Sequence, residues 1–283
     1  MFLLFDIGGT KLRIAVSRNL RTLDRVTIMP TPSTFRGGIA LIEKTARGLV
    51  NEARIRAVSG ATPGHIERSS DRLLCTPNLA WGGEPVISTL KKTFHAPVFI
   101  ENDAALAGLA EATTGAGRGV SIVMYYTVST GIGGARIVNG TIDAAAIGFD
   151  PGHQIINVEA QHDDQCSDRH VPGHLEAYAS GTALKRRYGK SAEKIRSQTV
   201  WKQVARLLAV GISNSIVHWS PEIVVLGGGL MNSIRLDALR IFVKQNLARS
   251  YGSGPPIVRA KLGDRAGLEG ARISLRQSLE SRK

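Results

Sequence analysis

The stretch "FDIGGTKLRIAV" at Phe5–Val16 joins an apolar segment to an alternating one through a pair of glycines. A second stretch, "TVSTGIGGARIV" at Thr127–Val138, repeats the same order of features. Alternation of apolar and polar residues predicts a strand, and glycines allow the tight turn that joins two strands into a hairpin. The repetition therefore predicts two similar half-structures, each containing one such hairpin.

Strands and helices alternate along the rest of the chain. Apolar residues recur at helical spacing over 37–53 and 200–220, whereas "APVFIEND" at 96–103 and "PEIVVLGGGL" at 221–230 each contain a buried strand. This alternation predicts the α/β class. We expect a domain boundary near "ENDAALAG", which divides the chain into residues 1–105 and 106–283.

Composition narrows the class of protein. Of the 283 residues, 43% are hydrophobic, which is typical of a globular chain that buries a core. No apolar run approaches the roughly 20 residues of a membrane span, and no basic leader precedes Asp6, so we expect neither a membrane partner nor secretion. Cys75 and Cys166 cannot build a disulfide framework, and together these features predict a cytoplasmic location.

The chain carries 36 Lys and Arg against 23 Asp and Glu, which gives a formal net charge of +13. Such an excess attracts anions, either nucleic acid or nucleotide phosphates. The basic residues are scattered through segments such as "LKRRYGK" and "SLRQSLESRK", as is typical of a solvated basic surface. We therefore expect no specific nucleic-acid partner.

The turn "DIGGTK" at residues 6–11 has the residues of an anion site. Its glycines leave space beside the backbone, and N–H groups exposed in such a turn form a concavity for anions. Thr10 adds a hydroxyl, Lys11 adds a positive charge, and Asp6 could hold Mg²⁺ through water. The spacing matches neither a Walker loop nor the dinucleotide fingerprint, and an ordinary tight hairpin is the alternative interpretation.

Two further glycine turns follow apolar strands, "STGIGG" at 129–134 and "GGG" at 227–229. Ligands of α/β folds bind at the carboxyl ends of strands, so three glycine turns at such ends indicate contacts with a phosphate or a nucleotide base. Each turn alone is a weak signal.

Asn102 and Asp103 also follow an apolar strand. An aspartate there can accept the proton of a substrate hydroxyl that attacks phosphorus, and an asparagine can hydrogen-bond a polyol through both amide groups. The alternative is a helix cap, because Asp before an Ala-rich segment is a common helix start. The two roles are compatible.

The segment "GHQIINVEAQHDDQCSDRHVPGHLEAYASG" at 152–181 is rich in histidine and carboxylates. Its spacing alone does not distinguish a metal site from a substrate contact or a solvated loop.

Taken in order, these motifs resemble the ROK family of repressors, open reading frames and sugar kinases, within the actin-like superfamily. The resemblance covers essentially the whole chain and includes "ATPG" at 61–64, "PNLAW" at 77–81, "LEAYASG" at 175–181 and "LGDRAGLEGAR" at 262–272. It implies an actin-like (ribonuclease H-like) two-domain fold with a cleft between two similar βαβ halves. Residues 1–105 would form the N-terminal domain and 106–283 the C-terminal domain, with the last helix packing back on the first.

The resemblance implies an ATP-dependent, glucokinase-like sugar kinase that uses Mg²⁺ and phosphorylates a hydroxyl, the 6-hydroxyl, of a hexose or N-acetylhexosamine. By resemblance Asp103 is the catalytic base. The implied nucleotide contacts are Asp6, Gly8, Gly9, Thr10, Lys11, Thr130, Gly131, Gly133, Gly228 and Gly229. The implied sugar contacts are Asn78, Asn102, Asp103, Asp150, His153 and Glu176.

The chain departs from the family pattern at several positions. Ser129 replaces a glycine of the second turn, Ala105 replaces an asparagine, and Asp150 replaces a glutamate. The family's zinc segment, "GH" followed by "C-x-C-G-x-x-G-C-x-E", corresponds here to "QCSDRHVPGHLE". Zinc accepts Cys, His and Asp, but a single thiolate holds it less firmly than several, and a metal-free loop is the alternative. The candidate zinc ligands are His153, Cys166, His174 and either Asp168 or His170.

Two other functions fit the same family. One is a sugar-binding regulatory protein without kinase activity, although repressors carry an N-terminal DNA-binding domain and the first hairpin here already begins at Phe2. The other is a non-catalytic sugar-binding protein, which the altered cysteine segment and Asp150 favour and the retained Asp103 disfavours. A homodimer is compatible with the resemblance, and the identity of the sugar is not encoded in these motifs.

Overall fold

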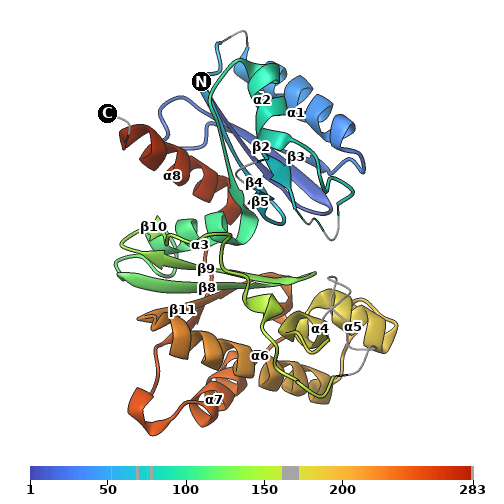
Figure 1. Ribbon diagram of the computed structural model, residues 1–283, viewed down its shortest axis with the longest axis vertical. Coiled ribbons are helices and arrows are strands. Elements are labelled where there is room, and N and C mark those ends of the chain that lie inside the picture. Colours follow the sequence, from blue (N-terminus) through green and yellow to red (C-terminus); the bar gives the residue numbers. More distant parts are fainter. Residues whose placement is uncertain (52, 68–69, 75, 77–78, 161–171, 282–283) are drawn as a thin grey trace. The chain divides into compact units, whose positions relative to one another are not determined.

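The computed structural model describes residues 1–283 except 52, 68–69, 75, 77–78, 161–171 and 282–283 (Figure 1). The chain divides into two compact units. The first contains Met1–Ala110, Ala144–Gly148 and Asp264–Lys283, and the second contains Glu111–Asp143 and Phe149–Gly263. Each unit contains one five-stranded sheet.

In the first unit, the predicted hairpin forms the antiparallel part of the sheet and two further strands extend it in parallel. The strand order is β3-β2-β1-β4-β7, with β1 antiparallel to β2 and parallel to β4. The six residues of β1 are all buried, as expected for a central strand covered on both faces. The strands are β1 (Phe2–Ile7), β2 (Lys11–Ser17), β3 (Arg25–Pro30), β4 (Ala57–Thr62) and β7 (Val98–Asn102), beside the small pair β5 (Ile66–Glu67) and β6 (Arg72–Leu73).

Helices cover both faces of this sheet (Figure 1). Helices α1 (Phe35–Val50) and α2 (Val86–Phe94) share one core cluster with alternate β1 residues such as Phe5. Helix α8 (Ala266–Glu280) packs on β1 and β4 from the other face, where Asp6 points toward Gly267. The last helix of the chain therefore completes the first unit.

The second unit repeats this plan with the order β10-β9-β8-β11-β12. Again a hairpin is antiparallel, β8 with β9, and β11 extends the sheet in parallel beside β8. The two similar half-structures predicted from the glycine hairpins are thus confirmed. The strands are β8 (Ile122–Val128), β9 (Ile132–Val138), β10 (Thr141–Ile142), β11 (Ile223–Gly227) and β12 (Ile257–Arg259).

Helix α6 (Gln198–Trp219) supplies much of the second core. Its first turn is capped by Ser197, whose hydroxyl accepts from the Val200 N–H, and Leu208 and Ile212 are fully buried against the sheet. Each such burial contributes about 1.5–3 kcal/mol. None of the described helices combines the length and apolar composition needed to span a bilayer. The other helices are α3 (Asp103–Thr113), α4 (Leu175–Ala179), α5 (Gly181–Tyr188) and α7 (Leu236–Asn246), with 3₁₀ turns η1 (Pro151–His153), η3 (Ala192–Lys194), η4 (Gly229–Asn232), η5 (Arg249–Tyr251) and η6 (Gly263–Arg265).

A buried carboxylate joins two distant segments of the second unit. Glu111 is fully buried near the end of α3, and its Oε1 accepts from the backbone N–H groups of Lys261 and Leu262 at 2.8 and 2.7 Å. Its Oε2 accepts from the Ala116 N–H at 2.8 Å. Because three backbone donors share one acceptor group, this side chain holds both segments in place.

Glu111→Ala should therefore lower the free energy of urea unfolding by at least about 3 kcal/mol, since each stranded backbone donor costs about 1–3 kcal/mol. Glu111→Gln keeps one acceptor oxygen and should recover part of the loss. Glu193→Ala, at an exposed carboxylate, is the matched control and should leave the urea midpoint unchanged. A Glu111→Ala protein as stable as the wild type would contradict this role.

Candidate active site

Asp6 lies on β1 opposite Arg13 of β2, in register across the hairpin. The carboxylate is 9% exposed, and its Oδ2 lies 3.2 Å from Arg13 Nη1. Arg13 Nη2 in turn lies 3.0 Å from Asp264 Oδ2 at the start of the C-terminal segment. A Cβ at Gly267 would lie 2.6 Å from Asp6 Cγ, so only glycine allows α8 to approach this carboxylate.

The surroundings of Asp6 decide its ionisation. Burial raises the pKa of Asp6 to about 6, and the charge and hydrogen bond of Arg13 act in the opposite direction. Sequence reasoning identified Asp6 but missed Arg13, although an alternating strand that follows a glycine turn places Arg13 opposite Asp6. A Mg²⁺ ion at Asp6 would share the carboxylate with this guanidinium.

The first glycine turn is fixed at its base and open at its tip. The Gly8 N–H donates to Lys11 O at 2.9 Å, and the Thr31 hydroxyl donates to Gly8 O at 2.6 Å. Gly9 and Thr10 are exposed, and the Lys11 side chain is 59% exposed with its Nζ 3.7 Å from Asp264 Oδ2. The arrangement leaves the turn's tip and its cation accessible to an anion.

Asn102 and Asp103 lie where β7 ends and α3 begins. Asn102 Oδ1 accepts from the N–H groups of Ala104 and Ala105 at 2.9 and 3.1 Å, while its Nδ2 donates to Gly64 O at 3.0 Å. Asn102 thus caps the helix, the role that the sequence suggested for Asp103. Asp103 Oδ1 accepts from the Ala104 N–H at 2.8 Å.

Because β1, β4 and β7 are mutually parallel, their carboxyl ends meet at one edge of the first sheet. The glycine turn follows β1 at this edge, and Asp103 follows β7. The first unit therefore presents an anion-type turn and a carboxylate at the same edge of one sheet.

The second glycine turn joins β8 to β9 and includes Thr130 and Gly131, with Gly133 just beyond it in β9. Within it, the Ser129 N–H donates to Gly131 O at 2.9 Å. The third turn follows β11, where Gly228 has a φ of 90° and packs against the backbone of Val128, the last residue of β8. Gly131 follows β8, and Gly228 and Gly229 follow β11, whereas Gly133 lies within β9 opposite Thr127.

Three of the predicted sugar residues belong to two neighbouring segments of the second unit. Asp150 precedes η1, and its Oδ2 lies 2.9 Å from Nδ1 of His153, the last residue of η1. The ring of His153 meets that of His174 edge to face, with centroids 5.1 Å apart. Two residues later Glu176 lies in the first turn of α4, where its Oε2 accepts from the Ile132 N–H at 2.7 Å.

A buried polar network supports the η1 turn. Gln154 Nε2 donates to Pro151 O at 2.8 Å and to the Tyr126 hydroxyl at 3.1 Å, and that hydroxyl lies 2.6 Å from Ser215 Oγ. Burial raises the pKa of Tyr126 far above its usual range, so the phenol stays protonated. Sequence reasoning missed this network, because Tyr126 in an apolar strand gives no signal of its distant partners.

The zinc set is only partly within the described residues. Cys166, Asp168 and His170 lie outside them, as does the predicted sugar residue Asn78. His153 and His174 are described, and no group of three His, Cys, Asp or Glu side chains suited to a metal occurs in the described part of the chain. The described residues alone therefore do not supply a zinc site.

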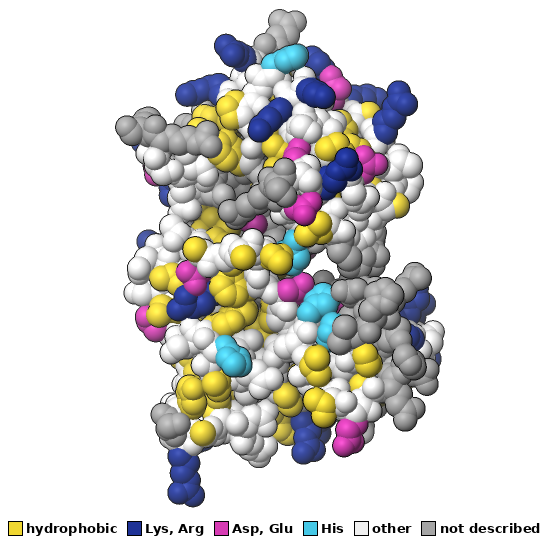
Figure 2. Space-filling view, viewed as in Figure 1, with side chains coloured by type: hydrophobic (Ala, Val, Ile, Leu, Met, Phe, Trp, Pro, Cys, Tyr) yellow, Lys and Arg dark blue, Asp and Glu magenta, His cyan; other side chains and the backbone are white. Residues whose placement is uncertain are grey.

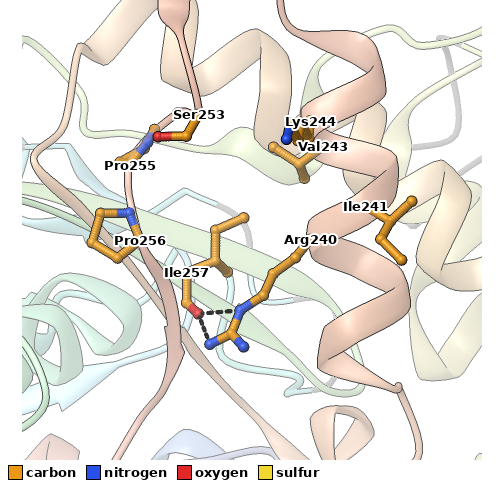
Figure 3. Close-up of a pocket in the computed structure, with 9 residues that line it drawn as sticks. Arg240, Ile241, Val243, Lys244, Ser253, Pro255, Pro256 and Ile257 are labelled. Carbon is orange, nitrogen blue, oxygen red and sulfur yellow. Dashed lines mark hydrogen bonds between the residues drawn. The ribbon is translucent and has the colours of Figure 1, made fainter.

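A cavity of about 460 Å³ in the second unit lies between α7 and residues 253–257, and none of the predicted site residues lines it (Figure 3). Arg240 extends from α7 across it, and its Nε and Nη2 donate to Ile257 O at 2.9 and 2.6 Å. The guanidinium thus closes one side of the cavity through a backbone contact. On the face seen in Figure 2, Lys and Arg side chains are dispersed among other residue types rather than gathered into one stripe.

The raised pKa of Asp6 predicts a pH-dependent effect on stability. The folded state binds the proton more tightly than the unfolded chain, whose carboxyl has a pKa of 3.8, so Asp6 makes the fold less stable as the pH rises from about 4 to about 6. Asp6→Asn removes this titration. Relative to wild type, the variant should gain up to about 3 kcal/mol in the free energy of unfolding across that window.

Urea unfolding of both proteins at several pH values between 4 and 7 measures this difference. Asp237→Asn is the control, because Arg235 lowers the pKa of that exposed carboxyl out of the measured window, so its difference from wild type should not change between pH 4 and 7. A difference between wild type and Asp6→Asn that does not change with pH would contradict the raised pKa.

Comparison with known proteins identifies the family. The ROK family model matches residues 3–278. The fructokinase of Zymomonas mobilis is 28% identical over 93% of this chain and 92% of its own, and the xylose repressor of Caldicellulosiruptor bescii is 28% identical over 80% of this chain and 64% of its own.

Solved structures agree in fold. The ROK hexokinase of Thermus thermophilus superposes with a TM-score of 0.86 at 27% identity, over 99% of both chains. A ROK glucokinase of Streptomyces griseus, solved with glucose and AMPPNP, gives a TM-score of 0.81 at 25% identity over 98% of this chain and 99% of its own. The protein has the actin-like α/β fold of these kinases, and the chain belongs to the ROK family.

Proposed function

We propose that this protein is an ATP-dependent sugar kinase that transfers the γ-phosphoryl group of ATP to the 6-hydroxyl of a hexose or N-acetylhexosamine, as a glucokinase does. The observation that carries the proposal is the edge of the first sheet, where Asp103 follows β7 and the glycine turn follows the parallel strand β1. Phosphoryl transfer needs a base for the attacking hydroxyl and donors for phosphate oxygens, and this edge has both types of group.

In the proposed reaction, the Asp103 carboxylate accepts the proton of the sugar hydroxyl as its oxygen forms a bond to the γ-phosphorus. The bond between that phosphorus and the β,γ-bridging oxygen breaks, and ADP leaves. Positioning and neutralisation of charge account for most catalysis in phosphoryl transfer. The exposed Lys11 ammonium and the N–H groups of the glycine turn would contribute to both.

The nucleotide is taken to be the substrate complex MgATP. Its phosphates would contact Gly8, Gly9 and Thr10 in the first turn. In the second unit, Thr130, Gly131 and Gly133 would make further phosphate contacts, and Gly228 and Gly229 would lie beside the adenosine. Asp6 would orient the magnesium ion through water, within the limits set by its pairing with Arg13.

The sugar would be bound by hydroxyl contacts to Asp150, His153 and Glu176, which the second unit already groups. Asp150 Oδ2 lies 2.9 Å from Nδ1 of His153, so the other ring nitrogen, Nε2, would be the one to contact the ligand. The Nδ2 group of Asn102 has two hydrogens, of which one is donated to Gly64 O, and the second would donate to a sugar hydroxyl. Asn78, outside the described residues, stays a predicted sugar contact.

The proposal has sugar and ATP as its partners and no specific nucleic-acid partner, in a cytoplasmic protein that forms a homodimer. Related chains include a xylose repressor as well as kinases, so regulation by sugar binding alone is the competing function. A structural zinc ion in the segment before α4 stays a prediction.

Asp103→Asn should lower kcat by about 10²–10⁴-fold, the usual contribution of a general base, while leaving the melting temperature unchanged. An ADP-release assay should be run over glucose, fructose, mannose, N-acetylglucosamine and N-acetylmannosamine. Asp237→Asn, at an exposed aspartate on α7, is the matched control and should keep wild-type turnover.

An undiminished rate in Asp103→Asn would refute its role as base. A wild-type protein that binds one of these sugars but releases no ADP with any of them would instead favour the regulatory function.

A further inference from the structure

We propose that Glu176 couples sugar binding to the phosphate loop, so that each substrate raises the affinity for the other. The phosphate loop is defined as Ser129–Gly134 and the coupling segment as His174–Thr182. The inference rests on the proposed kinase function, and all of its contacts lie within the second unit.

The first contact is made by the Glu176 side chain. Its Oε2 accepts from the Ile132 N–H at 2.7 Å, a bond from a predicted sugar residue to the backbone of the phosphate loop. A Cβ at Gly131 would lie 2.5 Å from the same oxygen, so the loop approaches the carboxylate more closely than any side chain allows. The carboxylate therefore determines where the amide of Ile132 can lie.

The far end of the coupling segment holds the same loop through its backbone. The Gly181 N–H donates to Ser129 O at 2.7 Å. The N–H and the hydroxyl of Thr182 both donate to Thr130 O, at 3.1 and 3.0 Å. Ser180 ends α4 and caps α5, with its hydroxyl accepting from the Ala183 N–H, so one residue joins the two helices directly.

The N-terminal end of the coupling segment contacts η1, the turn that contains the predicted sugar residue His153. His174 packs edge to face on His153, which pairs with Asp150. The Leu175 N–H donates to Gln154 O at 3.0 Å, and Gln154 is held by Tyr126. One continuous segment thus contacts the predicted sugar residues at its start and the phosphate loop at its end. Glu176 belongs to both sets, because it is a predicted sugar contact and also accepts from the loop amide of Ile132.

The consequence is thermodynamic. Sugar hydroxyls that donate to Glu176 restrict its carboxylate to one orientation, and that orientation is the one bonded to Ile132. A loop that the sugar has already ordered loses less conformational entropy when it binds nucleotide phosphates. The nucleotide must raise the affinity for the sugar by the same factor, because binding free energies are linked. Glu176 is therefore a positioning residue for the nucleotide as well as a sugar contact.

Calorimetric titration of the full-length protein with Mg²⁺ and AMPPNP tests this coupling, in buffer and at saturating glucose, fructose, mannose or N-acetylglucosamine. In the wild type, the bound sugar should lower the Kd of AMPPNP by at least about fivefold, within the range usual for coupled sites. The reciprocal titration of sugar with and without AMPPNP should return the same factor.

Two substitutions at Glu176 separate coupling from folding. Glu176→Ala should reduce the coupling factor to about one, because the link to Ile132 is lost. Glu176→Gln keeps an acceptor oxygen for Ile132 and should restore part of the factor, together with the wild-type melting temperature. Asp150→Asn is the matched control: it should weaken sugar binding but keep the coupling factor at sugar saturation, because Glu176 and its bond to the Ile132 N–H are retained.

Independent binding of sugar and AMPPNP to the wild type would overturn the coupling, as would an unchanged factor in Glu176→Ala. Either result leaves the kinase proposal intact if ADP release is still observed. A wild type that binds none of these four sugars or N-acetylmannosamine, and releases no ADP with any of the five, would overturn both.

Discussion

Strand β1 buries an aspartate on the same face as Phe2 and Leu4, and the rest of the first unit is arranged around that charge. Side chains alternate along a strand, so a slip of one residue in the pairing would place Asp6 in the apolar cluster under α1. The register that avoids this puts Arg13 directly opposite Asp6. The carboxylate also needs space on the side that α8 covers, and Gly267 of α8 provides it by having no Cβ. One buried carboxylate thus constrains a hairpin, a helix and the composition of that helix.

The two sheets have the same topology, but different kinds of contact hold their hairpin turns in place. In the first unit, charged side chains surround the turn, namely Asp6, Arg13 and Asp264. In the second unit, the equivalent turn is held by backbone bonds from α5 and by Glu176. The first turn therefore responds to charge and pH, whereas the position of the second depends on the segment that carries its contacts.

Local patterns predicted much of this structure. The period-two alternation identified β2 and β9, the helical period identified α1 and α6, and the glycine turns identified the ends of β1, β8 and β11. The alternative interpretation of Asp103 was a helix cap, whereas Asn102 makes the capping bonds to the Ala104 and Ala105 N–H groups; both residues are good cap formers, and only the fold decides between them.

What local patterns could not predict depends on contacts between distant residues. Glu111 accepts from Lys261 and Leu262, and Tyr126 contacts Gln154 and Ser215, at separations where no periodicity operates. The predicted roles of individual site residues rest on family resemblance and on their grouping within each unit. The predicted division at residues 105 and 106 likewise stays a prediction from sequence.

The contribution of α8 to the first unit has a consequence for biosynthesis. The strands of the first sheet are translated well before α8, the helix that covers Asp6 and its face of the sheet. The second unit, Glu111–Gly263 apart from its short excursion at 144–148, is fully synthesised before that helix exists. The nascent chain must therefore keep one face of its first sheet uncovered until α8 has been translated. Loss of α8 would expose that face to aggregation and to chaperones, even though the helix lies far along the chain from the strands it protects.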